Sequence, residues 1–191
     1  GTQHCHSEPF MPLLYETTQK AANLTEAEIA AIAERLRGQI AGEVRMDRYN
    51  RLMYSTDASI YQMVPVGVAV PRDADDVEAV IRTAREFGVP VMPRGGGTGL
   101  AGQTTNHAIV IDFSKYMRKI LEVNTEEGWV RAEPGIILDE LNRHLKADGR
   151  MFTPDPSTSN RSNLGGAIGN NSCGAHSIIW GKTIDNVREL E

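Results

Sequence analysis

Cysteine, aromatic residues and long apolar runs are all scarce in this sequence. It has two cysteines, Cys5 and Cys173, and aromatic residues make up 6% of its 191 positions. The two cysteines match no spacing of a zinc site or a redox pair, which indicates a reducing, cytoplasmic setting. No run of 18 apolar residues occurs, so the sequence predicts no membrane span. The N-terminus also lacks the charged and then apolar pattern of a signal peptide.

The sequence also has no excess of basic residues. The formal net charge is -5, which gives no general attraction to nucleic acid or to an anionic membrane. Any phosphate group must therefore be held by local backbone amides and a few basic side chains. His4, Cys5 and His6 are residue types that bind metals, but such a cluster at a terminus is commonly incidental, and we predict no metal site.

Apolar periodicity predicts an alternation of helices and strands. Thr25 to Glu28 has the pattern of a capping box, and the apolar stripe after it predicts one helix that ends near Gly42. A strand at 67–70, a helix from Asp73 to Gly88 and a strand at 89–92 would form a βαβ unit with parallel strands. The remaining predicted elements are strands at 108–111, 119–123 and 129–132 and a helix with Leu138, Leu141 and Leu145 on one face. Residues 1–24 show no period and are expected to form a loose lead-in.

The first candidate site is a glycine-rich loop between two predicted strands. Its notable residues are Arg94, Gly95, Gly96, Gly97, Thr98, Gly99 and Gln103. Successive N–H groups in such a loop can converge on an anion, and Arg94 can add a charge or anchor the loop. The glycines lead toward a strand and not into a helix, which argues against a Rossmann site, and His176 occupies a position that a P-loop ending at Gly181-Lys182-Thr183 needs as glycine. A flexible linker or a tight structural crossing is the alternative.

The second candidate site lies between Pro154 and Gly174. Its notable residues are Pro156, Ser157, Thr158, Gly165, Gly166, Asn171 and Gly174. Small residues would let a flat ligand lie against the backbone, and the Asn171 side chain could meet its polar edges. A small-residue helix or bend packed in a core is the alternative. For Cys173 and His176 we predict a packing role, because no partnered His and Asp pattern supports a nucleophile.

Together the two loops resemble the FAD-binding (PCMH-type) domain of vanillyl-alcohol-oxidase-type flavoproteins, in the branch of the D-lactate, glycolate and D-2-hydroxyglutarate dehydrogenases. The resemblance runs from about Asp57 to the end. It implies a two-lobed α+β fold, with a small parallel βαβ lobe and a mixed or antiparallel lobe, and FAD between them. On this basis residues 1–60 are a lead-in with one helix, and residues 61–191 are an incomplete FAD-binding domain. Gly95 to Gly97 stand where some relatives have the histidine that attaches FAD, so non-covalent binding is expected.

The resemblance also implies an activity. The flavin would accept a hydride from the α-carbon of a 2-hydroxy acid, with an unknown electron acceptor that could bring the protein to the membrane periphery. The catalytic residues and the substrate cap are expected beyond Glu191, so no catalytic residue is assigned. The segments at 42–44 and 54–61 resemble those of large bacterial members that carry an iron–sulfur region further along the chain. The alternative from another class is a flavin-binding electron-transfer or nucleotide-binding module that oxidises no substrate itself.

Overall fold

The computed structural model describes residues 10–191, with side chains from residue 16 onward. The helices are α1 (Phe10–Ala22), α2 (Glu26–Arg37), α3 (Arg48–Met53), α4 (Ala74–Phe87), α5 (Leu138–Leu145), α6 (Leu164–Gly169) and α7 (Ser177–Trp180), with short 3-10 turns at Lys146–Asp148 and Thr183–Asn186. The strands are β1 (Glu43–Arg45), β2 (Gly67–Val70), β3 (Val91–Arg94), β4 (Ile109–Asp112), β5 (Ile120–Asn124) and β6 (Trp129–Ala132). The fold is therefore α+β, as predicted.

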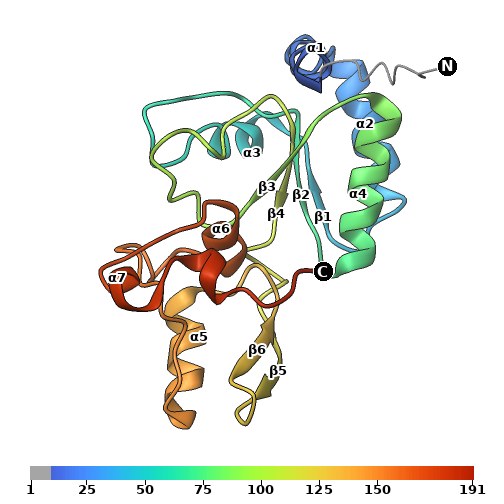
Figure 1. The fold of residues 1–191 in the computed structure, drawn as a ribbon. Helices are drawn as coiled ribbons and strands as arrows, with labels where there is room; N and C mark the ends of the chain where they lie inside the picture. The colour runs from blue at the N-terminus through green and yellow to red at the C-terminus, as the bar shows by residue number, and fades with distance from the viewer. Residues whose placement is uncertain (1–9) are drawn as a thin grey trace, which may run out of the picture.

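Four strands form a mixed sheet in the order β1-β2-β4-β3 (Figure 1). Both β2 and β3 run parallel to β4, which confirms the predicted parallel arrangement. However, β4 lies between them, so the two strands of the βαβ unit are not neighbours. All four residues of β2 and of β4 are buried, as expected for strands at the centre of a sheet.

Helices α2 and α4 cover one face of this sheet. Helix α2 begins with the predicted capping box, in which Thr25 and Glu28 each accept a hydrogen bond from the other's backbone N–H. Helix α4 begins at Asp73, whose side chain accepts from the N–H of Asp76, and ends at Gly88 with φ +64°. The prediction that α2 extends toward Gly42 was wrong, because the helix ends at Arg37 with Gly38 as its C-cap.

The N-terminal part is more ordered than predicted. Residues 10–22 form helix α1 and residues 48–53 form helix α3, so the expectations of a loose lead-in and of one helix before residue 60 were both wrong. Strand β1 also pairs antiparallel with β2. These residues therefore pack into the same body as the parallel strands. The His4-Cys5-His6 cluster lies outside the described residues.

The β5–β6 hairpin and α5 form a second unit, which lies below the sheet in Figure 1. The hairpin and the helix were both predicted, as was the end of the helical region at Gly149, which has φ +65°. Leu141 and Leu145 of α5 pack in a buried cluster with Ile136, against apolar residues of the hairpin. The chain then returns toward the sheet through residues 150–163, and this return brings the second loop to the first. None of the helices in the described part of the chain has the length and apolar character to cross a membrane.

Candidate functional site

The first loop leaves the sheet at Arg94, the last residue of β3, and this side chain fastens it. The guanidinium donates through Nη1 to the carbonyl oxygens of Tyr54 and Thr104, both at 3.2 Å, and through Nη2 to that of Thr56 at 2.7 Å. Burial lowers the pKa of Arg94. Three carbonyl oxygens accept from the guanidinium N–H groups of Arg94, so this side chain anchors the first loop.

The backbone of the first loop presents amides that are not used within the protein. Among residues 10–191, no N–H of residues 95–99 donates to a protein acceptor. Gly97 has φ +62°, in the left-handed region, and its carbonyl accepts from the N–H of Ala58 at 3.0 Å. The Gly97 carbonyl is thereby held by segment 54–58, while the N–H groups of the loop stay free for an anionic ligand.

The second loop closes directly on these glycines. A Cβ atom on Gly95 would lie 2.6 Å from Oδ1 of Asn163, and one on Gly96 would lie 2.3 Å from the carbonyl oxygen of Arg161. The hydroxyl of Ser162 lies 3.1 Å from that of Thr98 and 2.5 Å from that of Thr158. The structure thus brings together two segments that are more than 60 residues apart, and glycine at 95 and 96 is what permits the approach.

Gly99 and Gln103, two other predicted residues of the first loop, stabilise its conformation. A Cβ on Gly99 would lie 2.5 Å from Oε1 of Gln103, and the same Oε1 accepts from the N–H of Ala101 at 3.0 Å. Gln103 therefore closes the far end of the loop on itself. Its amide oxygen is directed at the loop backbone, so this atom is not free for a ligand.

The glycines of the second loop differ in their surroundings. A Cβ on Gly165 would lie 2.8 Å from Cβ of Pro134, and one on Gly174 would lie 2.0 Å from the carbonyl oxygen of Asp155, so both allow close packing. Gly166 has nothing within 4 Å of its Cβ position and is exposed. Residues 164–169 form a small-residue helix, which was one of the two alternatives, and Gly166 leaves an open surface on it.

The remaining predicted residues of the second loop are placed near its two ends. Pro156 offers its carbonyl to the N–H of Ser159 at 2.9 Å, and Ser157 beside it is exposed. Asn171 has φ +46°, and its Oδ1 accepts from the N–H of Ile184 at 3.0 Å. The oxygen of Asn171 therefore holds the following turn, and the polar role expected of it toward a ligand is limited to its Nδ2 group.

His176 does have an acidic partner, contrary to the sequence prediction. Its Nδ1 lies 2.7 Å from Oδ2 of Asp155, and its backbone N–H donates to Oδ1 of the same carboxylate at 3.1 Å. The backbone hydrogen bond from His176 lowers the pKa of Asp155. Within the described residues the exposed thiol of Cys173 makes no hydrogen bond to this pair, so the geometry is not that of an activated nucleophile. Cys173 and His176 are both exposed, so the structure does not show the packing role that was predicted for them.

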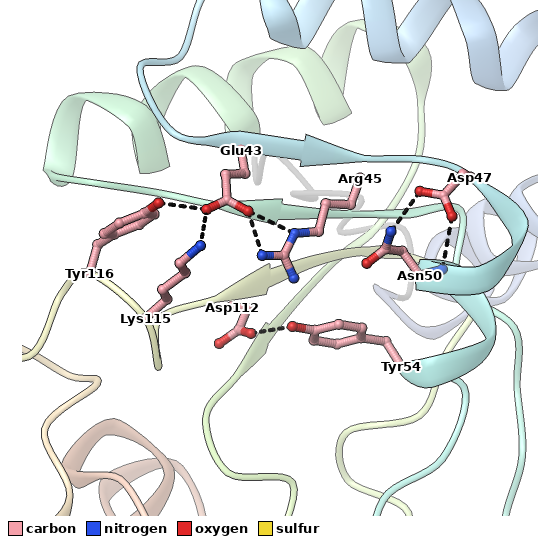
Figure 2. Close-up of polar contacts among 8 residues, drawn as sticks. All are labelled: Glu43, Arg45, Asp47, Asn50, Tyr54, Asp112, Lys115 and Tyr116. Atoms are coloured by element: carbon pink, nitrogen blue, oxygen red, sulfur yellow. Dashed lines mark hydrogen bonds and ion pairs between the residues drawn. The ribbon is translucent and has the colours of Figure 1, made fainter.

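A polar network on the sheet supports the anchor of the first loop (Figure 2). The hydroxyl of Tyr54 donates to Oδ2 of Asp112 at 2.5 Å, and burial together with this hydrogen bond raises the pKa of Tyr54. Next to it, Glu43 of β1 accepts from Lys115, from Arg45 and from the hydroxyl of Tyr116, with the last distance 2.5 Å. The hydrogen bond to Asp112 fixes the side chain of Tyr54, whose carbonyl oxygen in turn accepts from Arg94.

A hollow with a volume of about 890 Å³ lies elsewhere, between the β5–β6 hairpin, α5 and the C-terminal residues. Among the described residues, none of those that line it belongs to the first loop, although Leu164 and Ile168 of α6 do. The free amides of residues 95–99, which can converge on an anion, lie at the paired loops and not in this groove.

Sequence reasoning missed the residues that join the loops. Ser162 and Asn163 are 7% and 3% exposed and lie between the two stretches that had been singled out. An isolated bridge pairs Asn163 with Ile137, and the N–H of Leu138 donates to the carbonyl of Ser162 at 3.0 Å. The sequence signal at this point is Asn163, a polar residue before a short apolar segment, and this pattern predicts only a helix N-cap.

The site fits FAD on the features that the structure shows. Five successive free amides suit a pyrophosphate, and the open surface at Gly166 suits a flat ring. Fold and paired loops together define an α+β domain that binds a nucleotide-type cofactor.

Comparison with known proteins gives the family. A family described as FAD binding domain matches residues 65–191, so the chain belongs to it. The chain is 46% identical over 149 residues to a D-2-hydroxyglutarate dehydrogenase of Escherichia coli, a match that covers 76% of this chain and 15% of that protein. It is 37% identical to the glycolate oxidase subunit GlcD of Bacillus subtilis, over 80% of this chain and 33% of that protein. The chain thus spans a third or less of these relatives.

Solved structures confirm the fold. An alkyldihydroxyacetonephosphate synthase superposes with a TM-score of 0.65 at 21% identity, over 92% of this chain and 34% of that one. The carbohydrate oxidase of Microdochium nivale superposes with a TM-score of 0.68 at 19% identity, over 81% and 33%. At these identities the likeness establishes the PCMH-type α+β fold alone.

Proposed function

We propose that this chain is the FAD-binding part of a dehydrogenase that oxidises a D-2-hydroxy acid of the lactate, glycolate or 2-hydroxyglutarate type. The observation that carries the proposal is the meeting of two glycine loops around free amides 95–99. The names of the relatives, D-2-hydroxyglutarate dehydrogenase and glycolate oxidase subunit, support the substrate class. FAD, when bound, supplies the redox chemistry by accepting a hydride from the α-carbon of the acid.

The chain's own residues would hold and orient the cofactor. The amides of residues 95–99 would face the pyrophosphate, and their dipoles would compensate its charge, because Arg94 is turned toward carbonyl groups. Thr98 and Thr158, linked through Ser162, would set the distance between the loops. Gly166 would leave room for the ring. The other proposed contacts are at Gln103, Pro156, Ser157, Gly165, Asn171 and Gly174. Attachment would be non-covalent, with Gly95 to Gly97 offering no side chain to bond.

The extent of the domain is proposed as residues 61–191, preceded by the lead-in 1–60. The family match from residue 65 supports this division. A cytoplasmic location, a place at the membrane periphery through an unknown electron acceptor, and an iron–sulfur region in a longer protein stay predictions.

An absorption spectrum of the purified chain with added FAD tests the cofactor site. We expect flavin bands that elute with the protein and are released on denaturation. Gly97→Val should lose them, because a branched side chain at φ +62° is strained and its Cβ would lie 2.7 Å from Nη2 of Arg94. Full FAD retention by Gly97→Val, with an unchanged affinity, would contradict the proposed loop.

Substrate class is tested on the full-length protein. The enzyme-bound flavin should bleach on anaerobic addition of D-2-hydroxyglutarate, D-lactate or glycolate, with the L-enantiomers of the first two as controls. Bound flavin that none of these acids reduces would favour an electron-transfer or nucleotide-binding module instead.

A further inference from the structure

One buried polar atom at the meeting point of the loops has no partner among the described residues. Asn163 is 3% exposed, and its Oδ1 is buried without a hydrogen bond in the described residues. Its Nδ2 donates to the carbonyl oxygen of Gly135 at 2.5 Å, which fixes which end of the amide faces the first loop. A buried acceptor without a hydrogen bond destabilises a fold, and such atoms are rare in native proteins.

Helix capping does not explain this atom. Asn163 occupies the N-cap position of α6, where an asparagine oxygen ordinarily accepts from the second or third N–H of the helix. No such bond is made here, and the N–H of Gly165 donates instead to the carbonyl of Pro134 at 2.8 Å. The oxygen is turned away from its own helix and toward the backbone of the first loop.

Gly95 and Gly96 of the first loop lie in that direction. The ideal Cβ positions of these two glycines lie 2.6 Å and 3.4 Å from Oδ1 of Asn163. Their N–H groups are donors that lack an acceptor within residues 10–191. A phosphate oxygen cannot satisfy Oδ1, because both are acceptors, whereas an N–H of this segment can.

We propose that Asn163 is a positioning residue for the cofactor loop. When the first loop closes on the pyrophosphate, an N–H of the Gly95–Gly96 segment turns to Oδ1 of Asn163, while Nδ2 stays on the carbonyl of Gly135. One side chain then ties the first loop to the turn before α5, and the remaining amides are held in register for the anion. This inference rests on the proposed FAD site at residues 95–99.

The test compares FAD affinity with the stability of the FAD-free chain. Asn163→Ala should raise the FAD dissociation constant about tenfold, the factor that corresponds to one lost hydrogen bond of about 1.4 kcal/mol. Asn160→Ala is the matched control, because Asn160 is exposed in the same loop and, among the described residues, its side chain accepts one hydrogen bond, from Nε of Arg161. Fluorescence quenching of FAD gives the affinity, and thermal unfolding without FAD gives the stability.

A merely structural role would lower the unfolding midpoint of the FAD-free Asn163→Ala chain and leave its FAD affinity at the wild-type value. That outcome would overturn the proposal while leaving the FAD site itself in place. If Asn163→Ala does not fold, a crystal structure of the FAD-loaded wild-type chain decides the matter. We expect Oδ1 of Asn163 within about 3.2 Å of the backbone nitrogen of Gly95 or Gly96, and an Oδ1 without such a donor overturns the inference. Failure of the wild-type chain to bind FAD would count against the site and so against both proposals.

Discussion

Gly96→Ala isolates the contact between the two loops. Gly96 does not have a positive φ, so alanine is compatible with its backbone and only the added methyl group is tested. That methyl would lie 2.3 Å from the carbonyl oxygen of Arg161 and 3.3 Å from its carbonyl carbon. Ordinary contact begins at 3.4 Å, so the loops must separate by about 1 Å. Neither partner atom belongs to a flexible side chain that could turn away.

Overpacking of this size costs about 1–3 kcal/mol. If the strain is relieved by parting the loops, that energy is lost from cofactor binding, and the FAD dissociation constant should rise about 5-fold to 150-fold. Fluorescence titration with FAD measures this change, and thermal unfolding of the FAD-free chain shows how much of the strain falls on the fold.

Gly38→Ala is the matched control for this variant. Gly38 is exposed at the C-cap of α2, its Cβ position has no neighbour closer than 3.7 Å, and it lies outside both loops. It should bind FAD as the wild type does. An unchanged FAD affinity in Gly96→Ala, equal to that of Gly38→Ala, would refute the argument that close contact of the loops creates the site.

Two further variants test the open surface and the sheet network. Gly166→Ala should stabilise the FAD-free chain by up to about 1 kcal/mol, because alanine is the better helix former, yet weaken FAD binding if the ring lies on that surface; thermal unfolding and FAD titration measure the two effects. Contacts from Lys115, Tyr116 and Arg45, in that order, lower the pKa of Glu43 from 4.5 to about 2. Because the pKa of Glu43 is lower in the folded state, the ionised carboxylate stabilises the fold at pH values above 4.5. This stabilisation is lost as the pH falls toward 2. Glu43→Gln should therefore lower the unfolding free energy by about 1–2 kcal/mol at neutral pH, a value that allows for solvent screening. The difference in unfolding free energy between variant and wild type should shrink below about pH 4, which unfolding experiments across this pH range measure. A deficit that is constant across this range would contradict the assignment.

Local patterns predicted three of the four strands of the mixed sheet, but neither β1 nor the order of the strands. The strands at 67–70 and 109–112 are continuous apolar runs, and the caps at Thr25, Asp73 and Gly88 mark helix ends, so short-range chemistry was sufficient there. The insertion of β4 between β2 and β3 depends on long-range pairing, which no local pattern records.

Helix α1 was missed for a related reason. Its residues show no sustained apolar period, and Ala21 is the buried apolar residue among its described side chains. Contacts with α4 support its end, where Nζ of Lys20 donates to the carbonyl oxygen of Phe87 at 2.7 Å. A helix that depends on such contacts leaves little trace in its own sequence.

The glycine pattern identified the candidate loops but could not distinguish what each glycine does. Gly97 is needed for a left-handed backbone, whereas Gly95 and Gly96 are needed because another backbone segment passes close by. These three glycines shape the loops, and each has other atoms close to its Cβ position. Gly166 alone among the proposed glycines has open space at its Cβ position. A ligand in this site would therefore meet backbone amides in the first loop and a bare helix surface in the second, which is the combination that a cofactor with an anionic bridge and a flat ring requires.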